Sequence, residues 1–364
     1  MKSKPSRAAA IPQPYADRLR RVRESLGARK LDGYLVVSRM DQFWLTGFTG
    51  EDGAALITPS RVTLLTDGRF DETADREAPW ATKVVRTQRG PDSIAAPILR
   101  HKLRRVGFDP GDMNVALYTA LARLIRPGKL APVSGIVRDL RVCKDAGEVE
   151  AIRRAIRIAE DAFSEIRPLV RPGISESDLS ARLSFAMKQR GASGDAFSPI
   201  VAFGANGSLP HYETGDARLR EGEGVLVDWG CRAGWYVSDL TRMIWPSSIP
   251  PRLRGAYDAV VAAHDRAIEA IRPGVSAESV DRVARDVIRK AGYDKQFTHS
   301  LGHGIGLDVH EAPRVGKRAA DPLRPGMVVT VEPGVYLPGV GGVRVEDDVL
   351  VTETGFEVLS SLPN

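Results

Sequence analysis

The feature that most constrains this sequence is a duplication within its second half. Arg171-Pro-Gly-Ile-Ser175 recurs 101 residues later as Arg272-Pro-Gly-Val-Ser276, and each copy opens a helical pattern of similar length. Leu219-Arg-Glu-Gly222 recurs 104 residues later as Leu323-Arg-Pro-Gly326, and each copy leads into an apolar strand. Two motifs that repeat at nearly the same offset indicate that a whole segment is present twice.

Each copy is predicted to contain two helices followed by two strands. The first copy begins with a helix over 146–169, and Ser175 followed by Asp178 predicts a capping box at the next helix. The two strand pairs would meet at a pseudo-twofold axis, in a curved antiparallel sheet whose opposite face the helices cover. Two copies are too few for a solenoid. Residues 139–364 are therefore predicted to form one internally duplicated α+β domain.

The first part of the chain has a different pattern. A length of 364 residues exceeds the usual size of a single core, so two domains are expected. Helices are predicted over 18–30 and 93–104, and strands over 32–37, 54–58, 62–66 and 106–108. This alternation predicts an α/β domain over 15–138, preceded by a disordered tail over 1–14.

Composition and charge argue against several classes of function. The net charge of +6 is modest, and the basic stretch Arg18–Arg23 fits the solvated face of a helix, so no nucleic-acid partner is expected. No apolar run approaches the roughly 18 residues of a membrane span, and the first residues lack the apolar segment of a signal peptide. Two distant cysteines fit a reducing compartment. We therefore expect a cytoplasmic protein without a membrane partner.

Four carboxylates occupy matching positions in the two copies. Asp228 ends the apolar strand of the first copy and Glu332 ends that of the second, while the next strands carry Asp239 and Glu346. Four carboxylates that converge beside buried apolar residues would repel one another by several kcal/mol unless cations neutralise them. Two divalent ions that share bridging carboxylates would lie about 3.5–4 Å apart. We therefore predict a site for two divalent metal ions at the centre of the duplicated domain.

Histidines gather between the two acidic strand pairs. Three of the six histidines, at positions 299, 303 and 310, lie within Thr298–Glu311, and glycines 302, 304 and 306 surround the middle one. Glycine permits close approach of the backbone and interrupts a helix, so this stretch is typical of a site. Structural roles are expected for His101 and His264, which fall within helical patterns.

The ordered set Asp228, Asp239, His303, Glu332 and Glu346 resembles the metal ligands of the pita-bread metallopeptidases, which include aminopeptidase P, prolidase and methionine aminopeptidase. The matching stretches are Asp-Trp-Gly with Ser-Asp-Leu-Thr-Arg, Gly-His-Gly-Ile-Gly-Leu-Asp-Val-His-Glu, Val-Glu-Pro-Gly-Val-Tyr and Gly-Val-Arg-Val-Glu-Asp-Asp. In the first half, Trp44-Leu-Thr-Gly-Phe-Thr-Gly50 and Thr66-Asp-Gly-Arg-Phe70 look like the creatinase-type N-terminal domain. X-Pro aminopeptidases, prolidases and creatinase carry that domain, whereas methionine aminopeptidases generally lack it.

The resemblance implies a role for each matching residue. Asp228 looks like the chelating ligand of one metal, Asp239 and Glu346 like the bridges, and His303 and Glu332 like the ligands that complete the other. Such a ligand set suits manganese or cobalt, with iron or zinc as alternatives. A water molecule that bridges both metals would lose a proton near neutral pH and become the nucleophile.

The resemblance also assigns residues that do not bind metal. His211 and His310 match the histidines that flank the scissile bond and stabilise the tetrahedral intermediate, and His299 matches a further pocket histidine. Glu332 would also carry the proton to the leaving proline nitrogen. Arg314 and Arg344 are candidates for anchoring a carboxylate group, with structural pairing to Glu311, Glu346 or Asp347 as the alternative.

The implied activity is that of an X-Pro aminopeptidase, which removes the residue before a proline from a peptide. An X-Pro dipeptidase restricted to dipeptides is the alternative, because both activities use the same site. A non-catalytic binding module and a creatinase-like amidinohydrolase are disfavoured, because all five metal ligands are present in the sequence. The family further implies a homodimer.

Overall fold

The computed structural model describes residues 10–87, 90–125 and 129–364. Contacts within the chain divide it into two compact units, with the division between Leu140 and Arg141. Residues 1–9 of the predicted disordered tail lie outside the described residues, and the first helix begins at Tyr15.

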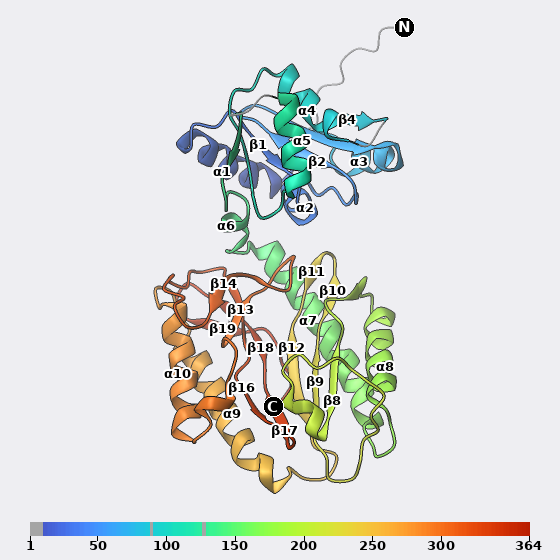
Figure 1. Cartoon of the computed structure of the whole chain (residues 1–364), viewed down its shortest axis with the longest axis vertical. Coiled ribbons are helices and arrows are strands. Elements are labelled where there is room, and N and C mark those ends of the chain that lie inside the picture. Colours follow the sequence, from blue (N-terminus) through green and yellow to red (C-terminus); the bar gives the residue numbers. More distant parts are fainter. Residues whose placement is uncertain (1–9, 88–89, 126–128) are drawn as a thin grey trace. The chain divides into compact units, whose positions relative to one another are not determined.

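The first unit is built on a mixed sheet of six strands in the order β4-β3-β2-β1-β5-β6 (Figure 1). Its strands are β1 (Gly33–Val36), β2 (Ala54–Ile57), β3 (Val62–Asp67), β4 (Thr82–Arg86), β5 (Val106–Phe108) and β6 (Leu130–Pro132). Its helices are α1 (Tyr15–Ala28), α2 (Arg39–Thr46), α3 (Asp71–Glu77), α4 (Pro91–Arg100) and α5 (Val115–Ile125). Leu35, Leu56, Ile98 and Leu121 are among the buried side chains that join sheet and helices in one core. The prediction of an α/β unit is therefore confirmed.

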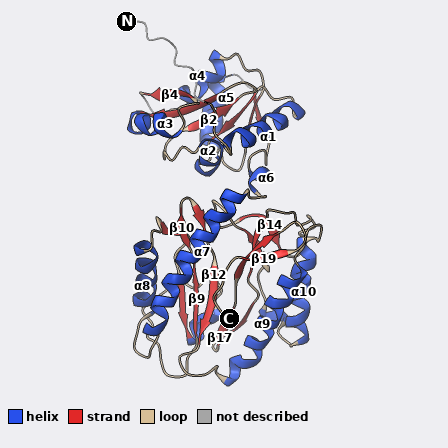
Figure 2. Ribbon diagram, turned by 180° about the vertical axis from the view of Figure 1, so that it is seen from behind, coloured by secondary structure: helices blue, strands red, loops and turns tan. Residues whose placement is uncertain are grey.

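The second unit carries two successive sets of helices and strands (Figures 1 and 2). The first set comprises α7 (Ala146–Ile166), α8 (Glu176–Gln189), β7 (Gly194–Asp195), β8 (Ile200–Phe203), β9 (Val225–Trp229), β10 (Cys231–Ala233), β11 (Tyr236–Val237) and β12 (Leu240–Ile244). The second set comprises α9 (Pro251–Ala270), α10 (Ala277–Lys290), β13 (Gly302–Gly304), β14 (Glu311–Val315), β15 (Val328–Val331), β16 (Gly334–Leu337), β17 (Gly341–Arg344), β18 (Asp347–Val351) and β19 (Phe356–Val358). Figure 1 shows α7 and α8 beside the strands of the first set and α9 and α10 beside those of the second.

The two sets repeat one plan of strand pairing. Strand β9 pairs antiparallel with β12, and the short hairpin β10–β11 lies between them in the sequence. Strand β15 pairs antiparallel with β18, and the hairpin β16–β17 lies between them. An antiparallel bridge between Thr241 and Glu346 links the two halves. The duplicated antiparallel plan predicted from the sequence is therefore confirmed.

Both copies of the Arg-Pro-Gly motif end in a serine that caps a helix. Ser175 Oγ accepts a hydrogen bond from Asp178 N at 3.1 Å, and Ser276 Oγ accepts one from Ser279 N at 3.3 Å. Among the described hydrogen bonds, the full capping box occurs at α7 instead, between Asp145 and Glu148. The helix predicted over 146–169 ends at Ile166 and continues as one 3₁₀ turn, because Pro168 lacks the N–H that an α-helix requires.

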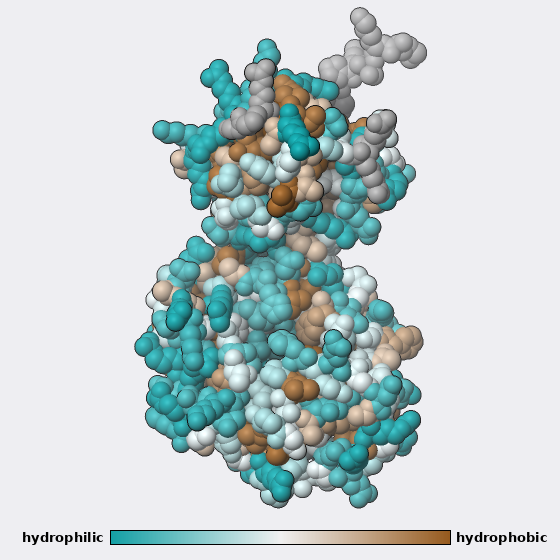
Figure 3. All heavy atoms as spheres, viewed as in Figure 1, coloured by the Kyte–Doolittle hydropathy of each residue, from teal (hydrophilic) through white to brown (hydrophobic). Residues whose placement is uncertain are grey.

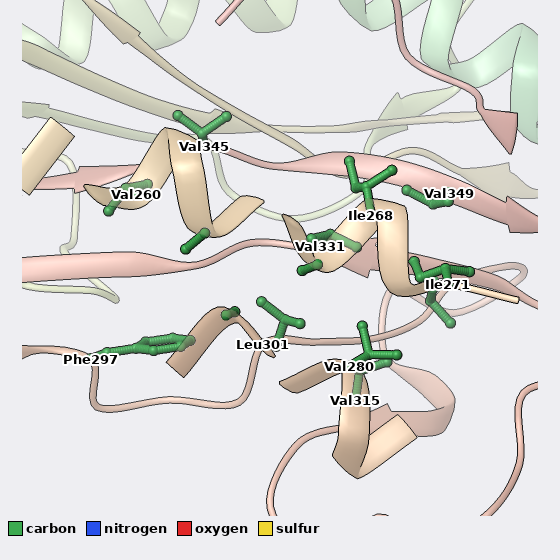
Figure 4. Close-up of a cluster of buried hydrophobic side chains, with 14 of the residues drawn as sticks. Val260, Ile268, Ile271, Val280, Phe297, Leu301, Val315, Val331, Val345 and Val349 are labelled. Atoms are coloured by element: carbon green, nitrogen blue, oxygen red, sulfur yellow. The ribbon is translucent and has the colours of Figure 1, made fainter. Parts of the chain in front are cut away.

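The core of the second half is made of branched aliphatic side chains, drawn in Figure 4. Val260 and Ile268 come from α9 and Val280 from α10, and they pack with Val331 and Val349 of the strands. Burying one such side chain stabilises a fold by about 1.5–3 kcal/mol. Figure 3 shows that hydrophilic residues cover most of one face of this unit. None of the helices in the described ranges is long and apolar enough to span a membrane.

Candidate metal centre and its cavity

The four predicted carboxylate ligands lie at equivalent places in the two halves. Asp228 lies in β9 and Glu332 directly follows β15, whereas Asp239 and Glu346 directly precede β12 and β18. The bridge between Thr241 and Glu346 brings the two strand pairs together at these ends. Ligand atoms of Asp239, His303 and Glu346 all lie within 4.8 Å of one another, close enough to hold one cation.

Burial and mutual repulsion raise the pKa values of these carboxyl groups. Burial raises the pKa of Asp239 well above its ordinary value, and the charges of Glu346, Asp228 and Glu332 add to the effect. Burial and the charge of Glu332 likewise raise the pKa of Glu346. The pKa of Glu332 rises to about 8, chiefly through burial. The site would thus carry unfavourable negative charge without a cation, which is the arrangement expected of a metal centre.

His303 faces these carboxylates with an unprotonated nitrogen. Its Nδ1 donates a hydrogen bond to the Gly304 main-chain oxygen at 3.1 Å, which leaves Nε2 as the acceptor. Nε2 lies 3.4 Å from Glu332 Oε1 and 3.7 Å from Asp239 Oδ2. Burial, followed by the charge of His310, lowers the pKa of His303 to about 4, so the ring is neutral and able to bind a metal at neutral pH.

The glycines beside His303 are required by close contacts of the backbone. A Cβ atom at Gly302 would lie 2.0 Å from the Thr330 main-chain oxygen, and one at Gly304 would lie 2.2 Å from that of Ala312. Strand β13 can therefore lie between its neighbours only with glycine at both positions, and this places His303 against the carboxylates.

The donor set fits a divalent cation. Asp228 Oδ1 is buried and accepts no hydrogen bond from any residue that the structure describes. Such an unpartnered buried oxygen is costly unless it has a ligand. Four carboxylates and one imidazole provide hard donors of the kind that manganese and similar ions prefer. Ligand atoms of three of the five predicted ligands converge and all five residues line one cavity, whereas their roles and the identity of the ion stay predictions.

A cavity of about 600 Å³ surrounds the carboxylates. All ten site residues predicted from the sequence line it, namely His211, Asp228, Asp239, His299, His303, His310, Arg314, Glu332, Arg344 and Glu346. The apolar side chains of Phe197, Ile200 and Val309 also line the cavity. The lining therefore combines charged and polar side chains with apolar ones, as in other small-molecule sites.

The three cavity histidines that were not predicted as ligands differ in their surroundings. The His310 ring lies 4.3 Å from the His303 ring, centroid to centroid. The His299 Nε2 atom lies 2.9 Å from the Tyr336 hydroxyl, and burial lowers the His299 pKa to about 4. His211 is exposed to solvent at the edge of the cavity.

The two predicted anchoring arginines have different partners. Arg344 is buried and donates to Asp228 Oδ2 at 2.5 Å, to Tyr336 Oη at 2.7 Å and, through Nε, to Thr241 Oγ1 at 3.1 Å. Its guanidinium group is therefore already engaged within the site. Arg314 Nε donates to Ser300 Oγ at 2.8 Å, and no carboxylate among the described residues forms an ion pair with Arg314.

Two residues of this network were not predicted as site residues. Thr241 Oγ1 donates to Glu346 Oε2 at 2.6 Å and so orients a predicted bridging carboxylate. Tyr336 connects His299 with Arg344. Both lie inside stretches that matched the metallopeptidases, Ser-Asp-Leu-Thr-Arg and Val-Glu-Pro-Gly-Val-Tyr, so their position in the motifs was the available signal.

Comparisons with known proteins cover nearly the whole chain. The model of metallopeptidase family M24 matches residues 150–353, and that of the creatinase/prolidase N-terminal domain matches residues 18–143. A solved Xaa-Pro dipeptidase from Bacillus anthracis is 35% identical, with a TM-score of 0.93 over 96% of this chain and 98% of that one. A solved X-Pro aminopeptidase from Thermotoga maritima is 33% identical, with a TM-score of 0.88 over 95% of this chain and 98% of that one. An Xaa-Pro dipeptidase from Pyrococcus horikoshii is 30% identical over 94% of this chain and 97% of its own.

Proposed function

The chain belongs to metallopeptidase family M24, and on that premise we propose that it is an X-Pro dipeptidase. It would hydrolyse the bond between an N-terminal residue and a proline that carries the free carboxylate. The observation that carries this proposal is Arg314, which lines the cavity without an acidic partner among the described residues. The similarity to Xaa-Pro dipeptidases from Bacillus anthracis and Pyrococcus horikoshii supports it.

Two divalent ions would be held by Asp228, Asp239, His303, Glu332 and Glu346, with manganese or cobalt favoured by the oxygen-rich ligand set. Bound there, they would supply Lewis-acid activation of a water molecule and of the scissile carbonyl.

Side chains around this centre would position the substrate and move the proton. His310 and His211 would donate hydrogen bonds to the substrate carbonyl oxygen as negative charge develops on it. The Glu332 carboxylate would take the proton of the attacking water and deliver it to the proline nitrogen as that nitrogen leaves. Phe197, Ile200 and Val309 offer the apolar surface that a proline ring requires.

Arg314 would bind the carboxylate of a C-terminal proline. A guanidinium group forms two parallel hydrogen bonds with a carboxylate, and the bond to Ser300 occupies only Nε. Neither terminal nitrogen of the guanidinium group is bonded to another described residue, so both could bind the substrate. A longer peptide has no carboxylate at this point, so the same contact would favour dipeptides.

The test compares three substrates that differ only after proline: an X-Pro dipeptide, its C-terminal amide and an X-Pro-Y tripeptide. Charge-assisted hydrogen bonds contribute about 1.5–3 kcal/mol, so kcat/KM for the dipeptide should exceed that for the amide by about 10- to 100-fold. Arg314→Gln should remove this preference. Lys317→Gln, the matched loss of an exposed charge just beyond β14, should retain it.

An X-Pro aminopeptidase remains the second candidate, supported by the similarity to the Thermotoga maritima enzyme. Rapid cleavage of the tripeptide, with a preference that does not depend on Arg314, would establish that activity instead. A homodimer in the cytoplasm completes the proposal. Light scattering and cell fractionation test these two points.

A further inference from the structure

The loop that carries His211 is held by Glu176, which is not one of the predicted site residues. Within the described part of the chain, the His211 ring makes no hydrogen bond, ion pair or ring contact, although it lines the cavity. An exposed ring without a partner is positioned only by its backbone. The geometry of residues 203–215 therefore determines where this imidazole lies.

Glu176, in the first turn of α8, fixes this loop at four points. Its carboxylate is completely buried and accepts hydrogen bonds from Phe203 N at 2.8 Å and Gly215 N at 3.3 Å. It also accepts from Asn206 Nδ2 at 2.9 Å and from the Tyr212 hydroxyl at 2.8 Å. A single carboxylate thus joins both ends and the middle of the loop.

Hydrogen bonds hold the residues on both sides of His211 in the sequence. Asn206 Nδ2 also donates to the Tyr212 hydroxyl at 3.0 Å, so that hydroxyl is held by two partners directly after His211. On the other side, Arg344 Nη1 lies 3.4 Å from the Pro210 main-chain oxygen. The two neighbours of His211 are therefore fixed while its ring remains free to meet a substrate.

The second half of the duplicated unit contains the same device. Asp281 of α10 is buried and accepts from Leu301 N at 3.1 Å and from Arg285 Nε at 2.7 Å. Arg285 in turn donates to the main-chain oxygens of Phe297 and His299. In each half, the second helix thus supplies a buried carboxylate that holds a loop with a cavity histidine.

We propose that Glu176 is a positioning residue for the reaction, acting on His211 through the loop 203–215. The inference rests on the proposed function, in which His211 contacts the substrate. Burying a carboxylate costs free energy that its hydrogen bonds must offset. Unlike an apolar side chain, the carboxylate fixes the positions of its four hydrogen-bond donors. It thereby fixes the position of His211, which lies between them in the sequence. A displacement of about 1 Å in a catalytic group can lower turnover 100-fold.

The test uses the full-length, manganese-loaded protein and two variants of the loop contacts. Glu176→Gln replaces one carboxylate oxygen with an amide N–H₂ group, which cannot accept hydrogen bonds from the loop. Tyr212→Phe removes the two hydrogen bonds of the hydroxyl, with Glu176 and with Asn206, and keeps the ring. Each should lower kcat about 10- to 100-fold, leave KM within about twofold and leave the bound manganese unchanged. Asp178→Asn is the matched control on the same helix, because the Asp178 side chain is exposed and its described contact is with Arg182.

A double-mutant cycle separates positioning from general destabilisation. In the His211→Ala background, Glu176→Gln should lower kcat no further, because its effect passes through the missing ring. If Glu176→Gln lowered kcat in the His211→Ala background by the same factor as in the parent protein, the proposal would be overturned.

Hydrogen exchange supplies a readout that needs no activity. Amide exchange in Glu176→Gln should accelerate over residues 203–215 and remain unchanged over 297–301, which Asp281 holds. Unchanged exchange over 203–215 would overturn the proposal. If the parent protein cleaves no X-Pro substrate, the proposed function fails, and the exchange experiment still decides whether Glu176 holds the loop.

Discussion

Arg242 Nη1 donates a hydrogen bond of 2.6 Å to the main-chain oxygen of Glu346, a predicted bridging ligand. The same guanidinium group pairs with Asp347 Oδ1 at 2.6 Å and donates to the Leu362 main-chain oxygen at 2.7 Å. Arg242 is only 2% exposed. One buried guanidinium group thus joins the backbone of the predicted ligand to the Asp347 carboxylate and to the main chain at Leu362.

Replacing Arg242 with methionine should therefore destabilise the protein strongly. The substitution leaves Asp347 as a buried charge without this partner, which typically costs about 3–5 kcal/mol. Urea denaturation measures the loss. Arg254→Met removes an exposed pair with Asp258 and should cost less than about 1 kcal/mol. Equal free energies of unfolding for the two variants would show that the buried ion pair stabilises the protein no more than the exposed one.

Asp239→Asn should abolish metal binding and activity in a folded protein. The change removes the charge of a carboxylate that lies among Asp228, Glu332 and Glu346, and relieves their repulsion in the metal-free state. The metal-free variant should therefore be at least as stable as the parent. Elemental analysis and circular dichroism provide the measurements. A variant that keeps its full metal content and turnover would remove Asp239 from the ligand set.

His310→Ala should retain the metal and lose most of the turnover. The His310 ring lies 4.3 Å from the His303 ring, and His310 is not one of the five predicted metal ligands. Loss of one hydrogen-bond donor to a developing oxyanion typically lowers kcat about 100- to 1000-fold. Steady-state kinetics at a verified metal content tests this, and unchanged kcat would exclude the proposed role.

The metal-free protein should become less stable as the pH rises from about 6.5 to about 8. The pKa of Glu332 is about 8 in the folded state against an ordinary 4.5, so the unfolded chain releases this proton first. Stability then falls as pH rises between these values. His299 and His303 act in the opposite direction, because their folded pKa values of about 4 lie below the ordinary 6.5. Their contribution is complete near pH 6.5, which leaves only the carboxyl groups above it.

Denaturation in the presence of a chelator, measured at pH 6.5 and at pH 8, provides the comparison. Glu332→Gln removes one of the titrating groups and should reduce the slope. A stability that stays constant or increases over this range would contradict the proposed protonation of the empty centre. The same protons should be released when metal is added, and calorimetry in buffers of different ionisation enthalpy measures them.

The plan of the second unit could be predicted because its signals are long and repeated. The Arg-Pro-Gly-x-Ser motifs and the paired carboxylates mark equivalent points in both halves, so each half supports the interpretation of the other. The four candidate carboxylate ligands followed from their matching positions in the two copies, and His303 followed from the resemblance to the metallopeptidases. Their convergence in one cavity is a finding of the structure, whereas their individual roles stay predictions.

The first unit was less predictable. Helix α2 spans only eight residues and is followed by Gly47 in the left-handed conformation, and strand β4 lacks an alternating buried pattern. Strand β4 is held by its parallel pairing with β3, 19 residues earlier in the chain, and short sequence windows do not contain that information. Arg242 and Glu176 were not predicted as site residues for the same reason. The Asp347 partner of Arg242 lies 105 residues away, and the partners of Glu176 lie 27 to 39 residues away.

The bridge between Thr241 and Glu346 also has an evolutionary consequence. Because it places ligands from both copies around one centre, a substitution in one hairpin changes the environment of its counterpart. The two copies are therefore not free to diverge independently at these strand ends, and selection acts on them as a pair. The two copies differ beyond these strand ends, where His211 lies in the first copy and the histidine cluster around His303 lies in the second.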